Sequence, residues 1–145
     1  GPDNRVHQVG PPLEIYRHPS DTFVADFIGS SNLLQGSCVG TREVKLGDKH
    51  LVVEEMPGGV TEGTSVTVSV RPEDIHVLPG ADKGDNRLHG TVAFIRDVGS
   101  NVEIYLNCNG LQIISQSTPK GRPDLKQGDK ATAILPAASC IVLKS

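Results

Sequence analysis

The spacing of apolar residues changes near residue 32, which divides the chain into two parts of different structure. Before that point, Phe23 and Phe27, and likewise Val24 and Ile28, lie four residues apart. Such spacing gathers side chains on one face of a helix. Prolines on either side of residues 13–18, and the glycine at position 29, would begin and end helical segments. The pattern therefore predicts two short helices at the start of the chain.

From residue 33 onward, apolar and polar residues alternate, as expected of half-buried strands. The clearest runs are Val66-Thr-Val-Ser-Val70 and Val102-Glu-Ile-Tyr-Leu106. Asn109-Gly110 stands between two apolar runs and is the strongest hairpin turn in the sequence. Short strands with frequent turns predict an antiparallel β-sandwich or β-barrel.

Similar segments occur twice in this β region. Leu34-Gln-Gly-Ser resembles Leu88-His-Gly-Thr, and residues 63–72 resemble residues 128–136. Chance similarity between strands rich in valine and glycine is one explanation. We favour a duplication that yields a first β-lobe at 33–79, a polar linker at 80–87 and a second β-lobe at 88–145.

Composition narrows the classes of partner. The net charge is −3, and the chain holds three Phe, two Tyr and no Trp. A nucleic-acid-binding domain usually presents a basic face, and one that binds single strands also presents stacking aromatics. We therefore expect no nucleic-acid partner. The three scattered cysteines favour reduced thiols over a disulfide framework.

No motif in the chain indicates catalysis, and we expect no catalytic residue and no metal site. Residues 58–65 approach the phosphate-binding loop pattern, but Thr64 replaces its lysine and a strand is predicted to follow. A Gly-rich hairpin is the better interpretation. The five histidines lack the spacing of a zinc site, and no signature of a nucleophilic enzyme is present.

Arg71, Glu73 and Asp74 form one candidate site, at the end of the predicted strand 66–70. The simpler interpretation is a turn that ends the strand and holds a local arginine–carboxylate pair. The functional alternative is a fixed polar corner at an interface with a subunit or a ligand.

Lys120 and Arg122 form a second candidate, in a loop that could bind an anion. Such loops are more often solvated, and Asp124 and Asp129 reduce the positive charge of this one.

Three segments together resemble the C-terminal portion of the ATP-binding subunits of bacterial ABC importers of the polyamine, ferric-iron, sulfate and maltose type. They are residues 8–32, which include Gln8-Val-Gly-Pro-Pro-Leu-Glu-Ile-Tyr16, the run Val70-Arg-Pro-Glu-Asp-Ile75, and Leu88-His-Gly-Thr-Val92 with the late Gly128-Asp129. The resemblance implies an OB-like fold of the transport-associated (TOBE) type. It also implies that residues 3–32 are the tail of the ATPase domain and its linker helices. Independently of the resemblance, Gly1-Pro2 is interpreted as a remnant of a protease site.

This resemblance implies a non-catalytic regulatory and dimerisation domain. ATP and magnesium would bind only to an ATPase domain upstream, since the phosphate-loop lysine and the signature motif of that domain are missing here. Partners would be a second copy of the subunit and, through the ATPase domain, the membrane permease subunits at the cytoplasmic face of the membrane. The alternative is a sensor of a small effector, an oxyanion or a polyamine. An oligonucleotide-binding OB domain is the third possibility.

Overall fold

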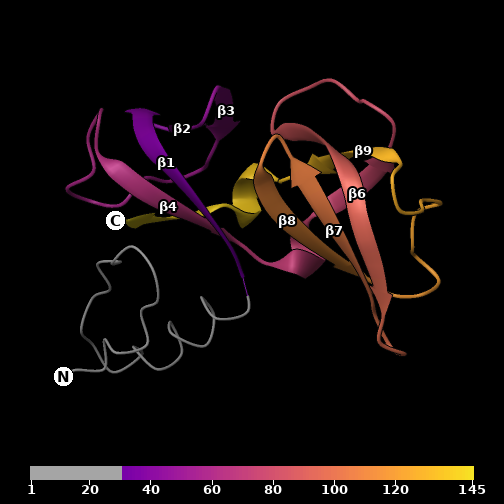
Figure 1. The fold of residues 1–145 in the computed structure, drawn as a ribbon. Coiled ribbons are helices and arrows are strands. Elements are labelled where there is room, and N and C mark those ends of the chain that lie inside the picture. Colours follow the sequence, from indigo (N-terminus) through magenta and orange to yellow (C-terminus); the bar gives the residue numbers. More distant parts are fainter. Residues whose placement is uncertain (1–30) are drawn as a thin grey trace.

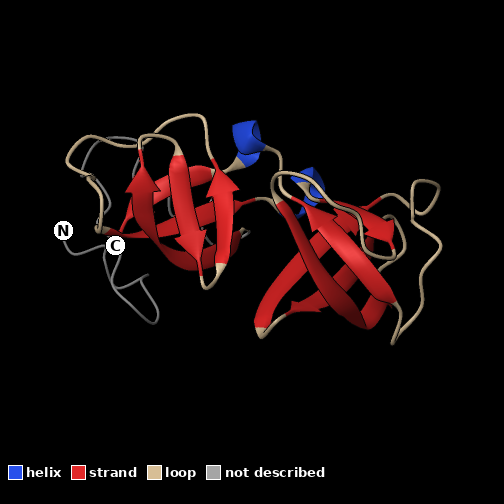
Figure 2. Ribbon diagram, turned by 90° about the horizontal axis from the view of Figure 1, so that it is seen from above, coloured by secondary structure: helices blue, strands red, loops and turns tan. Residues whose placement is uncertain are grey.

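The computed structural model describes residues 31–145, which form two curled antiparallel sheets side by side (Figures 1 and 2). The predicted mainly β, OB-like fold is confirmed. The two predicted helices lie outside the described residues. The strands are β1 (Asn32–Gly40), β2 (Glu43–Leu46), β3 (Lys49–Val52), β4 (Ser65–Val70), β5 (His76–Pro79), β6 (Arg87–Asp97), β7 (Val102–Cys108), β8 (Leu111–Ser117), β9 (Lys130–Ile134) and β10 (Ile141–Lys144).

Each sheet is five-stranded, and the two have equivalent strand orders. Lobe A has the order β10-β4-β1-β2-β3, and lobe B the order β5-β9-β6-β7-β8. Residues 31–79 thus form β1 to β5 and residues 87–144 form β6 to β10 with the same internal pairing. This equivalence supports the duplication inferred from the repeated segments.

The last strand of each half pairs in the sheet of the other half. β5 pairs with β9, with His76 opposite Ile134, and β10 pairs with β4, with Val142 opposite Val68. Figure 1 accordingly shows the C-terminus beside β4. Two 3-10 turns, η2 (Pro72–Asp74) and η3 (Ala137–Ser139), lie where the chain crosses between the lobes (Figure 2). Each lobe is therefore completed by a strand from the other half of the sequence.

The alternating pattern is confirmed in β7, whose odd and even positions differ in burial throughout. The Asn109-Gly110 hairpin between β7 and β8 is also confirmed, with φ values of 57° and 87°. Both residues thus adopt the left-handed conformation that a tight hairpin requires.

Two sequence predictions are wrong. The strand at 66–70 is buried on both faces, since Thr67 and Ser69 are as inaccessible as the valines. The Thr67 hydroxyl is satisfied by Gln35 and Ser145, at 3.1 and 2.9 Å. The Gly-rich segment at 58–65 does not form a hairpin, because β1 and β2 lie between β3 and β4 in the sheet.

The buried apolar residues of both lobes form one connected core, with Leu34 and Val68 from lobe A and Leu106 and Ala133 from lobe B. The three cysteines are unpaired and buried in it. Within residues 31–145, no helix has the length and hydropathy needed to span a membrane.

Candidate functional sites

Arg71 precedes the 3-10 turn η2 and Glu73 lies within it, and the two form the local ion pair that the sequence predicted. Arg71 Nη1 lies 3.7 Å from Glu73 Oε2, and both side chains are partly exposed. The turn is held by the Asp74 amide, which donates to Arg71 O at 3.0 Å, and by Pro72 at its first position. A separation of 3.7 Å at the surface contributes little to stability. A role for this corner as an interface remains a prediction.

A shallow groove runs beside this corner, between β5 and the end of β8. Its volume is about 420 Å³. Two of its lining residues are joined by a hydrogen bond, since the Ser115 hydroxyl donates to Ile75 O at 2.9 Å. Ser117 Oγ is buried and has no hydrogen-bond partner among the described residues. Other polar lining residues are Glu73, His76, Asn101, Gln116 and Thr118. The groove can offer hydroxyl, amide and imidazole groups to a small polar ligand.

Lys120 and Arg122 lie in the loop between β8 and β9, and they do not line this groove. Thr118, Gly121 and Pro123 from the same loop do line it. The Arg122 guanidinium is 3.5 Å from Leu125 O, so it contacts its own loop. The loop and Glu73 therefore line the same groove, whereas the two cations of the loop lie outside its lining.

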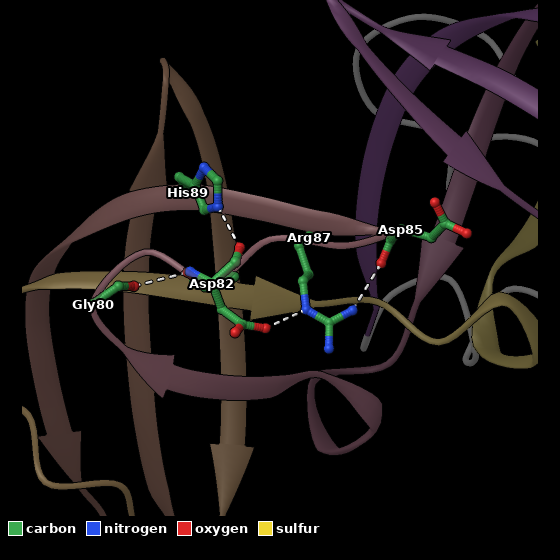
Figure 3. Close-up of polar contacts among 6 residues, drawn as sticks. Gly80, Asp82, Asp85, Arg87 and His89 are labelled. Carbon is green, nitrogen blue, oxygen red and sulfur yellow. Dashed lines mark hydrogen bonds and ion pairs between the residues drawn. The ribbon is translucent and has the colours of Figure 1, made fainter.

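The linker at 80–87 is held to lobe B by a network of polar contacts (Figure 3). The Thr132 hydroxyl donates to Gly80 O at 2.8 Å and accepts from the Asp82 amide at 2.9 Å. The Asp82 carboxylate forms an ion pair with Arg87, and the Asp82 carbonyl accepts a hydrogen bond from His89 Nε2. Because these polar groups are paired with one another, the network positions the linker and offers no activated catalytic group.

An aromatic pair occupies the exposed face of β6 and β7. The rings of Phe94 and Tyr105 stack with centroids 4.1 Å apart, and Phe94 is 44% exposed. Glu103 accepts hydrogen bonds from Tyr105 at 3.2 Å and from Arg96 at 3.0 Å. Partial burial and the Glu103 carboxylate raise the pKa of Tyr105. An exposed stack with charged neighbours is suited to contact with another protein.

Sequence reasoning missed two asparagines that connect the lobes, Asn32 and Asn86. Both are 7% exposed, and each makes hydrogen bonds to a strand of the other lobe. Their equivalence could have been recognised from the sequence, because each asparagine stands four residues before the glycine of the repeated Leu-x-Gly segment. Within residues 31–145, no cluster of three or more His, Cys, Asp or Glu side chains could hold a metal ion.

Comparison of the sequence with known proteins identifies a matching domain family and similar proteins. The profile of the TOBE domain matches residues 68–143. The chain is 34% identical over 115 residues to the spermidine/putrescine import ATP-binding protein PotA of Bacteroides thetaiotaomicron, covering 79% of this chain and 24% of PotA. It is 30% identical over 147 residues to the maltose/maltodextrin import ATP-binding protein MalK of Vibrio cholerae, covering 97% of this chain and 39% of MalK. The chain thus spans between about a quarter and two fifths of these relatives.

A solved structure shares the fold. The cytoplasmic molybdate-binding protein ModG, with molybdate bound, superimposes with a TM-score of 0.66 at 22% sequence identity. The superposition covers 79% of this chain and 96% of ModG. At this identity the similarity establishes a common fold of two OB-like lobes.

Proposed function

Because the chain belongs to the TOBE domain family, we propose that it is a non-catalytic regulatory and dimerisation domain of the ATP-binding subunit of an ABC importer. The observation that carries this proposal is the extent of the similarity to MalK. Nearly the whole chain aligns, 97%, yet the alignment covers only 39% of MalK. The remainder of such a subunit has room for a separate ATP-binding domain.

The proposed partners follow from that assignment. A second copy of the subunit would pack against this domain about a two-fold axis and keep two ATPase domains together. ATP and magnesium would bind to the ATPase domain and not to residues 31–145. Permease subunits would be contacted through the ATPase domain, at the cytoplasmic face of the membrane.

Two surfaces are suited to the second copy. One is the polar corner of Arg71, Glu73 and Asp74, and the other is the exposed Phe94–Tyr105 stack. Protein interfaces are enriched in aromatic and arginine side chains at their centres. The aromatic stack is the stronger candidate of the two, because it exposes apolar area that a partner would bury.

The second candidate function is a sensor of a small effector that regulates the ATPase. Two observations favour it: the groove beside β8, in which Ser117 Oγ lacks a partner, and the molybdate bound by the similarly folded ModG. For an oxyanion the sequence offers Lys120 and Arg122, which lie in the loop beside the groove without lining it, and for a polyamine it offers Glu54 and Glu55 or Glu73 and Asp74. The relatives named for spermidine and putrescine import make the polyamine a specific alternative.

A thermal-shift panel separates these functions. The ligands are molybdate, sulfate, ferric citrate, spermidine, maltose, ATP with magnesium, and a short single-stranded DNA. A ligand at a hundred times its dissociation constant adds about 2.7 kcal/mol to the stability of the folded state, which is easily measured. A shift with one effector supports the sensor, and a shift with DNA contradicts the importer assignment. For a purely structural dimerisation domain, no ligand shifts the melting temperature.

ATP turnover tests the non-catalytic part of the proposal. The purified chain is expected to release no phosphate from ATP above the rate of a heat-denatured sample. Sustained turnover that survives further purification would contradict the proposal.

A further inference from the structure

Two buried asparagines make the same set of hydrogen bonds at two places between the lobes. Ile114 of β8 donates its amide to Asn32 Oδ1 at 2.8 Å, and Asn32 Nδ2 donates to Ile114 O at 2.9 Å. Val52 of β3 donates its amide to Asn86 Oδ1 at 2.7 Å, and Asn86 Nδ2 donates to Val52 O at 2.8 Å. In each case one side chain pairs with both backbone groups of one residue.

This pairing imitates an additional strand. β3 and β8 are edge strands of lobe A and lobe B, and an edge strand presents unpaired N–H and C=O groups. The carboxamide of asparagine carries an acceptor and a donor side by side, as a peptide group does. The Asn86 side chain therefore pairs with Val52 as a neighbouring strand would, and the Asn32 side chain pairs with Ile114 in the same way.

Each asparagine also binds its own lobe, through a third hydrogen bond. Asn32 Nδ2 donates to Val70 O at the end of β4, at 3.1 Å, and Asn86 Nδ2 donates to Leu135 O directly after β9, at 2.8 Å. The Nδ2 group of each side chain thus donates to both lobes, whereas its Oδ1 accepts from the other lobe. Both side chains are almost fully buried, so the loss of these partners would leave polar groups unsatisfied.

The two positions are equivalent in the repeat but differ in backbone conformation. Asn32 begins β1, whereas Asn86 directly precedes β6 and has a φ of 57°. Asparagine tolerates this left-handed conformation better than most residues. The same hydrogen-bond set is therefore made from two different backbone conformations, which indicates that the side chain is what the two sites have in common.

We infer that Asn32 and Asn86 are paired inter-lobe latches, that is, coupled contacts that hold the two lobes in one orientation. Asn32 does so by hydrogen-bonding to the free edge of β8, and Asn86 by hydrogen-bonding to the free edge of β3. The inference does not rest on the proposed function, since it concerns only contacts within residues 31–145. Such a contact differs from a local hydrogen bond in one respect. Because both asparagines join the same two lobes, breaking the inter-lobe hydrogen bonds of one asparagine weakens those of the other.

Hydrogen exchange of two backbone amides tests this difference. The Asn86→Gly variant keeps the left-handed backbone and removes the carboxamide. The Val52 amide is then expected to exchange at least about tenfold faster, as for the loss of one hydrogen bond in a buried site. The amide of Ile114, at the other latch, is expected to exchange faster as well. Asn32→Ala should also accelerate exchange at both amides, with the sites reversed: the Ile114 amide loses its partner directly, and the Val52 amide is affected remotely.

Asn109→Gly is the matched control for Asn86→Gly. Asn109 has the same φ of 57° but lies in the exposed β7–β8 hairpin. Asn101→Ala is the control for Asn32→Ala, since its side chain makes a local hydrogen bond to the adjacent Ser100. Neither control should change exchange at Val52 or Ile114. Should Asn86→Gly fail to fold, Asn86→Asp keeps the size of the side chain and replaces the donor by an oxygen that faces two carbonyls.

Acceleration at both amides in either latch variant supports the inference. Acceleration confined to the amide next to the substitution would overturn it, because the asparagines would then be independent local hydrogen bonds. Unchanged exchange at both amides would overturn it too.

Discussion

Gly36 and Gly90 occupy equivalent positions in the two lobes, and at both a neighbouring strand leaves no room for a side chain. A Cβ at Gly36 would lie 2.5 Å from Lys45 O, and a Cβ at Gly90 would lie 2.5 Å from Asn107 O. Backbone oxygens cannot move aside as a flexible side chain can. The repeated Leu-x-Gly segment of the sequence is therefore a packing requirement between β1 and β2, and again between β6 and β7.

Substitution of either glycine by alanine is expected to destabilise the fold. Overpacking of this kind costs about 1–3 kcal/mol. Urea unfolding of Gly36→Ala and Gly90→Ala measures the loss. Gly58→Ala is the control, since a Cβ there meets nothing within 4 Å and its φ is not positive. Equal stability of the three variants would contradict the packing argument.

Thr132 is expected to be needed for attachment of the linker. Thr132→Val removes the hydroxyl that binds Gly80 O and the Asp82 amide, at a cost of about 1 kcal/mol, typical of the loss of a partly buried hydrogen bond. The loss is measured by urea unfolding, and proteolysis of the linker should become faster. Thr41→Val, on an exposed turn, controls for the exchange of threonine for valine. Unchanged cleavage and stability in Thr132→Val would show that the linker is held by other contacts.

The sequence predicted the architecture of each lobe better than the relation between the lobes. Alternation and the Asn109-Gly110 turn identified β7, β8 and their hairpin, because these depend on neighbouring residues. Exchange of β5 and β10 between the sheets was not predicted. The pattern of a strand shows which face is buried, but not which of two similar sheets it joins.

The same limit applies to the candidate sites. Arg71 and Glu73 are close in sequence, and their ion pair was predicted. Lys120 and Arg122 were grouped by charge alone, whereas the loop directs Arg122 towards Leu125 O. Asn32 and Asn86 act across the lobes, so their partners Ile114 and Val52 could not be derived from local sequence.

Stability is expected to fall at alkaline pH because of two buried thiols. Burial raises the pKa of Cys108 to about 11 and that of Cys140 to about 12, from an ordinary value of 9.0. As the pH rises above 9.0, the unfolded chain releases these protons before the folded chain does, so it binds fewer protons. The free energy of unfolding must then decrease with pH until the folded-state pKa values are passed.

Denaturant titrations across this range measure the decrease. The Cys108→Ala/Cys140→Ala variant is the control, and its stability should fall less steeply above pH 9.0, whatever its stability at neutral pH. In the native protein at neutral pH, both thiols should also resist alkylation until denaturant is added. Parallel profiles for the two proteins would contradict the assignment of the slope to these cysteines.

Self-association tests the central claim, that this chain is a dimerisation domain of an importer subunit, most directly. Sedimentation equilibrium should compare residues 1–145 with residues 31–145, because apolar side chains such as Phe23, Phe27 and Ile28 drive association wherever they are exposed. The account predicts that both forms dimerise reversibly, and that Phe94→Ala weakens the dimer of residues 31–145. A dimer formed only when residues 1–30 are present, or a monomer at millimolar concentration, would contradict it.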